Sequence, residues 1–99
     1  MILEAALLQV ITGREAEFEA AFREASPIIA GMCGYRGHTL NRCIEVDAKY
    51  LLIVQWESLE DHTVGLRESP EYERWRALLH HFYDPFPVVE HFSEVPLDG

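Results

Sequence analysis

The sequence has no apolar run approaching the roughly 18 residues that a membrane-spanning helix needs. Residues 1–4 lack the basic segment that opens a signal peptide, so we expect a small soluble protein that remains in the cytoplasm. Positive charge is also scarce. The sequence has 8 Lys and Arg residues against 17 Asp and Glu residues, which gives a net charge of −9. A field of this sign repels phosphate backbones and anionic lipids, so neither nucleic acid nor a membrane is expected as a partner.

Cysteine is rare, and the spacing of Cys33 and Cys43 fits neither a CxxC redox pair nor a zinc site. We interpret them as reduced thiols, which are usual in the cytoplasm. The adjacent His80 and His81 would point in different directions on a helix, and the sequence has no HExxH pattern. Glycine-rich phosphate loops and dinucleotide fingerprints are missing as well. The sequence therefore predicts a protein without a metal site or a bound cofactor.

What remains is the composition of an ordinary folded domain, with 48% hydrophobic and 25% charged residues. No repeat or linker interrupts it, which favours a single domain over residues 1–99. Residues 2–11 are apolar on both alternating faces, with Glu4 and Gln9 as the only polar interruptions. This pattern predicts a strand that is buried on both sides, and residues 50–56 predict a second such strand.

The first helix is expected after a capping box. Thr12 and Glu15 have the T-x-x-E spacing in which each side chain bonds the backbone of the other. The helix should run to about Ala30, with Pro27 kinking it or ending it early. Its apolar positions recur at helical spacing. They are Phe18, Ala21, Phe22, Ala25, Ile28 and Ile29.

A second helical region is expected in two parts. Ser58 is the predicted cap of the first part. Ser69 is the predicted cap of the second, with Pro70 at its first helical position. The buried face of this helix is predicted to contain Tyr72, Trp75, Leu78, Leu79 and Phe82.

The remaining strands are expected over residues 35–46 and 88–95, with a turn at residues 47–49. The resulting β-α-β-β-α-β order predicts a ferredoxin-like α+β domain with an antiparallel sheet. Two helices cover only one face of such a sheet, yet two of its strands are apolar on both faces. The uncovered apolar face predicts a homodimer in which two sheets pack face to face.

Four segments together resemble the antibiotic biosynthesis monooxygenase domain family. They are Gly13-Arg14-Glu15 ahead of Phe18, residues 34–38, residues 50–62 and residues 69–75. The resemblance extends over nearly all of the chain and implies a dimeric α/β barrel. Members of that family include cofactor-free oxygenases of polycyclic phenols, haem-degrading enzymes, and small aldehyde or quinol oxygenases.

The haem-degrading branch is the less similar one. It uses an Asn on the first strand, and this chain has none there. Gly65 and Trp75 stand at the positions of its Trp and His. The resemblance therefore implies a chemistry other than haem degradation.

The polyketide-oxygenating branch is more similar. Its Trp at the end of the third strand corresponds to Trp56, and its helical Arg corresponds to Arg76. His62 stands in place of its Tyr, and Leu52 in place of its strand Asn. The resemblance thus implies oxygenation with an altered set of polar groups.

Oxygenation without a cofactor requires a dry pocket that holds a base and a group that stabilises the substrate anion. His62 is the candidate base, because a neutral imidazole can accept a proton. Together with Trp56 and Arg76 it forms the predicted catalytic set. Core packing is an alternative role for Trp56. A surface salt bridge with Glu73 or Glu71 is the simpler account of Arg76.

Four more residues are candidates for substrate binding. Tyr72 and Trp75 belong to the apolar face of their helix, so core packing is the alternative. His38 lies on a strand whose orientation the sequence leaves open. His91 lies on the last strand and faces either the pocket or the dimer interface.

These features predict a small cofactor-independent monooxygenase that acts on a phenolic, quinol or anthrone-like molecule in a cleft between sheet and helices. The alternative is a non-catalytic small-molecule-binding or regulatory homodimer of the same fold.

Overall fold

The computed structural model describes residues 1–98 and contains a four-stranded antiparallel sheet with the strand order β2-β3-β1-β4. The strands are β1 (Ile2–Gln9), β2 (Tyr35–Arg42), β3 (Lys49–Trp56) and β4 (Val89–Ser93). The helices are α1 (Glu15–Ala30), the π-helix η1 (Asp61–Leu66), α2 (Pro70–Leu79) and the short 3₁₀-helix η2 (His80–Phe82). This order confirms the predicted ferredoxin-like α+β fold.

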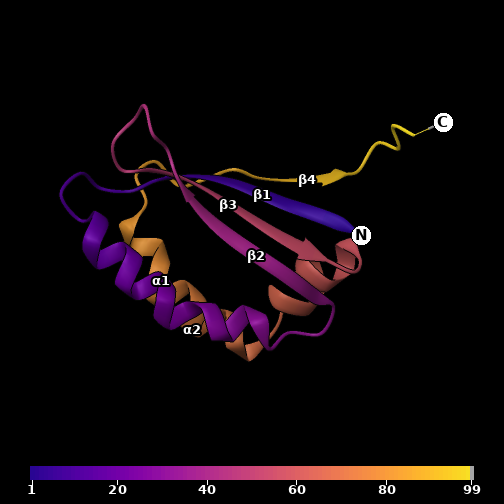
Figure 1. Ribbon diagram of the computed structural model, residues 1–99. Helices are drawn as coiled ribbons and strands as arrows, with labels where there is room; N and C mark the ends of the chain where they lie inside the picture. Colours follow the sequence, from indigo (N-terminus) through magenta and orange to yellow (C-terminus); the bar gives the residue numbers. More distant parts are fainter. Residues whose placement is uncertain (99) are drawn as a thin grey trace.

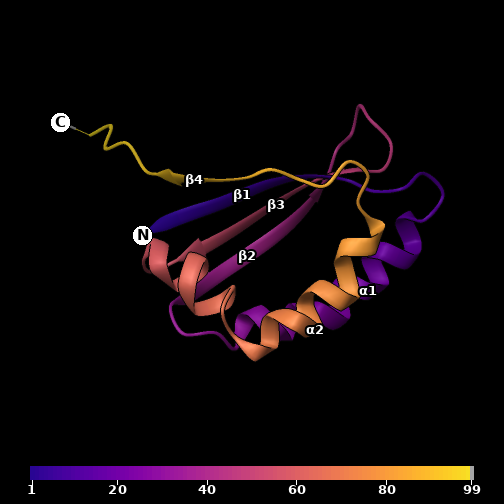
Figure 2. The same cartoon turned by 180° about the vertical axis from the view of Figure 1, so that it is seen from behind.

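Both long helices lie on the same side of the sheet, as the two opposite views in Figures 1 and 2 show. The core lies between these two layers, because alternate residues of the central strands point toward the helices. On β1 the inner residues are Glu4, Ala6 and Leu8, all of which are buried. Facing them across the core are buried side chains of the helices, namely Phe18, Phe22, Ala25, Ile29, Trp75 and Leu79.

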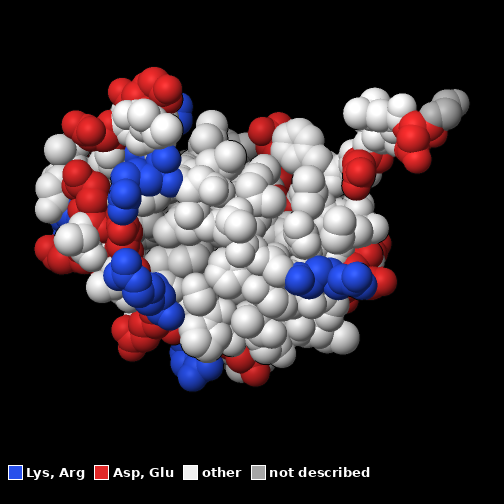
Figure 3. All heavy atoms as spheres, viewed as in Figure 1, with Lys and Arg blue, Asp and Glu red and all other residues white. Residues whose placement is uncertain are grey.

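The outer face of the sheet carries exposed apolar side chains that no helix covers. Leu7 on β1 pairs with Leu51 on β3, and their exposed fractions are 57% and 36%. Phe92 on β4 is 49% exposed. Charged side chains lie mainly around the rim of the molecule in the view of Figure 3, and that face has no broad basic surface.

The capping box predicted at Thr12 is wrong. Helix α1 begins after Arg14, with no side-chain hydrogen bond at the cap. Glu15 accepts a hydrogen bond from the N–H of Gly13 at 2.5 Å, because a turn from Ile11 to Arg14 brings that group to the carboxylate. The helix then continues through Pro27 to its end.

The other start signals are confirmed. Ser69 Oγ accepts a hydrogen bond from the N–H of Tyr72 at 3.2 Å, with Pro70 as the first helical residue. Ser58 and Asp61 cap each other reciprocally. The two strands predicted over residues 35–46 and 88–95 are shorter than expected. Residues 43–48 form a loop, and the last strand has five residues.

None of the helices described within residues 1–98 combines the length and the apolar character that crossing a membrane requires.

Candidate functional site

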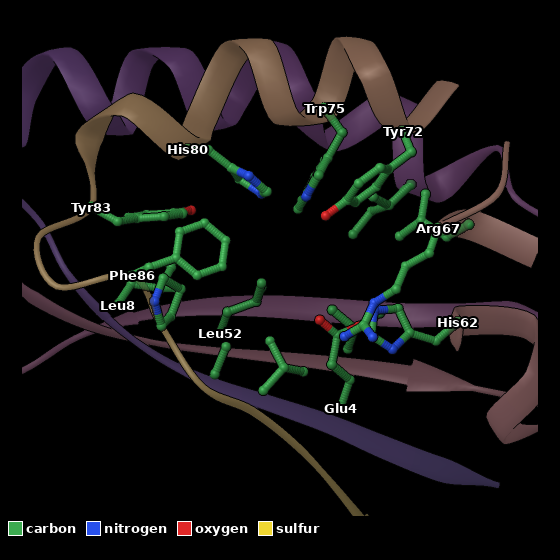
Figure 4. A pocket seen from close by; sticks show the side chains of 16 residues that line it. Glu4, Leu8, Leu52, His62, Arg67, Tyr72, Trp75, His80, Tyr83 and Phe86 are labelled. Carbon is green, nitrogen blue, oxygen red and sulfur yellow. The ribbon is translucent and has the colours of Figure 1, made fainter. Parts of the chain in front are cut away.

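A cavity of about 350 Å³ lies between the inner face of the sheet and the layer that contains α2 (Figure 4). Its sheet side is apolar and includes Ala6, Leu8, Leu52 and Val54. Aromatic rings line much of the rest. They belong to Tyr72, Trp75, His80, Tyr83 and Phe86. The ring centroid of His80 is 5.0 Å from that of Phe86 and 6.0 Å from those of Tyr72 and Tyr83. Such a surface suits a flat aromatic molecule.

A buried carboxyl group lies at the other end of the cavity. Glu4, on β1, is only 6% exposed. Its Oε1 accepts a hydrogen bond of 2.9 Å from Nε1 of Trp56, whereas its Oε2 has no hydrogen-bond partner within residues 1–98. Burial raises the pKa of Glu4, although the Trp56 bond and the charge of Arg67 act in the opposite direction. Glu4 is therefore a weaker acid than an exposed glutamate, and one of its carboxyl oxygens remains available for a hydrogen bond beside the cavity.

His62 lies directly against this carboxyl group. Its ring stacks on that of Trp56, with centroids 5.7 Å apart and an interplanar angle of 22°. Its Nε2 is 3.3 Å from Glu4 Oε1, and its Nδ1 is hydrogen bonded to Nε2 of His91 at 2.7 Å. Burial, with smaller effects of Arg67 and His91, lowers the pKa of His62 to about 3. The imidazole is therefore neutral at physiological pH, so one of its two ring nitrogens carries no proton.

The position of His62 depends on the turn before it. Asp61 accepts hydrogen bonds from the N–H and the hydroxyl of Ser58, at 3.1 and 3.0 Å. The Asp61 carboxylate packs directly on Gly34, where a Cβ atom would overlap it. Gly34 has φ +83° and accepts a hydrogen bond of 2.7 Å from the N–H of Glu57. These contacts anchor the start of η1 to the end of the sheet.

Arg67 completes the polar end of the cavity. It follows η1, and its backbone N–H donates to the carbonyl of His62 in the i to i+5 pattern of a π-helix. Figure 4 shows its guanidinium beside Glu4 and His62. Within residues 1–98 this guanidinium forms neither an ion pair nor a hydrogen bond. A cation of this kind at the cavity surface is available to an anionic ligand.

Glu4, His62 and His91 form a linear chain of contacts and do not converge on one point. No cluster of three His, Cys, Asp or Glu side chains in the described part of the chain could hold a metal ion.

The model of the antibiotic biosynthesis monooxygenase family matches residues 1–78. The chain belongs to this family. It is 60% identical over 95 residues to the uncharacterized protein YczJ of Bacillus subtilis strain 168, covering 96% of this chain and 100% of that protein.

Several solved structures have the same fold as this chain. A candidate member from Bordetella bronchiseptica is 37% identical, with a TM-score of 0.91 over 96% of this chain and 97% of that chain. SnoaB, a cofactor-independent oxygenase from Streptomyces nogalater, is 23% identical. Its TM-score is 0.68, over 99% of this chain and 97% of that chain, which shows a shared fold. The predicted family resemblance is thus confirmed.

Five of the predicted site residues lie at or next to the cavity of this family member. His62, Tyr72 and Trp75 line it. Trp56 is fully buried behind Glu4, and His91 lies behind His62. The alternation along β4 turns His91 toward the helices, on the face opposite to Phe92.

Arg76 and His38 lie elsewhere. Arg76 is on the exposed side of α2, where its guanidinium pairs with Glu73 at 2.9 Å. His38 lies on the edge strand β2 and packs toward α1, bonded to Ser26 at 3.1 Å and to Tyr35 at 2.5 Å. Neither side chain lines the cavity, because α2 turns Arg76 to solvent and β2 is two strands away from β1.

Sequence reasoning missed Glu4, Arg67, His80 and Tyr83. Glu4 had a usable signal, because it is the one charged residue on an otherwise apolar strand and shares the parity of Ala6. Arg67 had no such signal in the sequence, since residues five apart do not lie side by side on an α-helix with 3.6 residues per turn.

Proposed function

We propose that this chain is a cofactor-independent monooxygenase that acts on a phenolic, quinol or anthrone-like molecule. The observation that supports it best is the neutral His62 beside the buried Glu4, at one end of a cavity lined by aromatic rings. A proton acceptor in a dry cavity is the main requirement of such a reaction.

In the proposed reaction the Glu4–His62 pair accepts a proton from an acidic carbon of the substrate. The carbanion transfers electrons to O₂ and forms a carbon–oxygen bond. The resulting peroxide anion takes a proton back as C–OOH, which loses water to leave a C=O group. A CH₂ group and O₂ thus become C=O and H₂O, and O₂ is the only oxidant required.

The test is oxygen uptake by the purified protein with a panel of hydroquinones and anthrones, with mass spectrometry of the products under ¹⁸O₂. We expect uptake with at least one compound and one labelled oxygen in its product. Binding of these compounds without oxygen uptake would favour the alternative, a non-catalytic small-molecule-binding or regulatory protein.

Arg67 is the group proposed to stabilise the substrate anion. Replacing Arg67 with methionine should lower kcat/KM by about 10²-fold, because a positioned charge at a developing oxyanion contributes that much to rate. The control is Arg74→Met, a surface arginine on α2 outside the cavity. Turnover would be measured at saturating and limiting substrate. A loss at Arg76→Met in place of Arg67→Met would instead favour the residue indicated by the family resemblance.

The proposed assembly is a homodimer formed through the outer face of the sheet, within the cytoplasm. The exposed Leu7, Leu51 and Phe92 support the dimer, since large exposed apolar side chains gathered on one face often mark an interface between proteins. Cys33 and Cys43 are both free thiols, as is usual in a reducing compartment.

Light scattering at micromolar concentration should therefore give twice the mass of the chain. Leu7→Glu should yield monomers, because it introduces a charge into an interface expected to exceed roughly 1,000 Å². Leu59→Glu changes an exposed leucine outside the sheet and should remain dimeric. A monomeric wild-type protein would contradict this assembly.

A further inference from the structure

We propose that His91 is the outer end of a proton relay that connects the cavity, through His62, to solvent. The proposal deepens the proposed function, on which it rests for the source of the proton. Its basis is the direct contact between two imidazoles that belong to different elements, His62 of η1 and His91 of β4.

The two histidines are joined through the ring nitrogen of His62 that is opposite the one beside Glu4. Nε2 of His62 lies toward the cavity, 3.3 Å from Glu4, and Nδ1 is bonded to His91 Nε2 at 2.7 Å. A neutral imidazole has one protonated and one unprotonated ring nitrogen, so it can accept a proton at one nitrogen and release another from the opposite one.

His91 leads from this contact to solvent. It lies directly across from Glu4 in the pairing of β1 with β4, and β4 is an edge strand. Its side chain is half-buried, and its Nδ1 has no partner within residues 1–98. No buried side-chain nitrogen or oxygen in the described chain lacks a partner, so this Nδ1 is accessible to water.

In the proposed transfer, each N–H bond that breaks is matched by one that forms. We assign the resting His62 a proton on Nδ1, donated to Nε2 of His91. A proton that arrives at Nε2 of His62 displaces the Nδ1 proton onto His91, and the His91 imidazolium then releases its own Nδ1 proton to water. One proton leaves the cavity, and the reverse sequence returns one to the peroxide anion.

Surrounding charge favours release at the outer end. The ionisable groups that face His91 are Glu4 from β1, His62 from η1 and Arg67 from the turn after η1. Burial and the charge of Arg67 both lower the pKa of His91, so its imidazolium is short-lived. Moving the proton two groups away also prevents it from quenching the carbanion before O₂ arrives.

The test needs no substrate, which keeps it separate from the test of oxygenation. In ¹⁵N-histidine-labelled protein, NMR would measure how fast the ring protons of His62 exchange with water. His91→Gln retains a hydrogen-bonding group but cannot carry a proton, and we expect it to slow this exchange by about 10²-fold. The control, His81→Gln, removes an exposed imidazole that does not line the cavity and should change nothing.

A second variant separates proton transfer from a purely structural role. His91→Ala should also slow exchange, and free imidazole added to this variant should restore the rate. Unchanged exchange in His91→Gln, or no rescue of His91→Ala by imidazole, would overturn the relay. If oxygen uptake is never observed but exchange behaves as expected, the relay stands and the proposed oxygenation fails.

Discussion

Replacing His62 with alanine should lower turnover by about 10²-fold or more, while the fold remains intact. The substitution removes the neutral imidazole that lies 3.3 Å from Glu4 and leaves the carboxyl group with the Trp56 bond alone. His81→Ala is the matched control, because it removes an exposed histidine outside the cavity. Oxygen uptake, with circular dichroism to verify folding, would measure the effect. Wild-type turnover in His62→Ala would remove His62 from the mechanism and leave Glu4 as the proton acceptor.

The pH profile of the wild-type protein adds a second check on the same residue. Because burial holds the pKa of His62 at about 3, its imidazole stays neutral as the pH falls through the weakly acidic range. Glu4 behaves in the opposite way, since its raised pKa means that it becomes protonated first as the pH falls. A loss of activity on mild acidification therefore reports protonation of Glu4, and it should persist in variants of His91.

Replacing Gly34 with alanine should lower the free energy of unfolding by about 3 kcal/mol, from left-handed backbone strain and overpacking together. Gly34 has φ +83°, and the added Cβ atom would overlap the carboxylate of Asp61. Either the backbone must move or Asp61 must leave Ser58. Both changes would displace His62, so activity should fall together with stability. Chemical denaturation would measure the loss.

Two further variants separate the effect of backbone strain from that of the steric overlap with Asp61. Gly13 also has a positive φ, +91°, but a Cβ atom there would meet nothing within 4 Å. Gly13→Ala should therefore cost only about 1 kcal/mol, from backbone strain alone. Adding Asp61→Ala to Gly34→Ala should recover part of the loss by removing the overlapping group. Equal costs at the two glycines would show that the contact with Asp61 is unimportant.

The order of elements, the fold and the uncovered apolar face follow from local patterns in the sequence. The alternation along β1 determines which residues share a face, so the sequence alone could have predicted that Glu4 lies on the same face as Ala6. Ser69 and Pro70 determine the start of α2, because a cap depends only on neighbours along the chain. The family resemblance also follows from local sequence, since it depends on four short segments of the chain.

The polar end of the cavity was decided by tertiary structure. Glu4 and Trp56 are 52 positions apart, and His62 and His91 are 29 apart. Only strand pairing brings the first two into contact, and only the packing of η1 against the sheet brings the second two together. Arg67 reaches His62 because η1 is a π-helix, whose wider turn stacks residues five apart. Sequence periodicity assumes 3.6 residues per turn, a value for which these two residues lie on different sides of the helix.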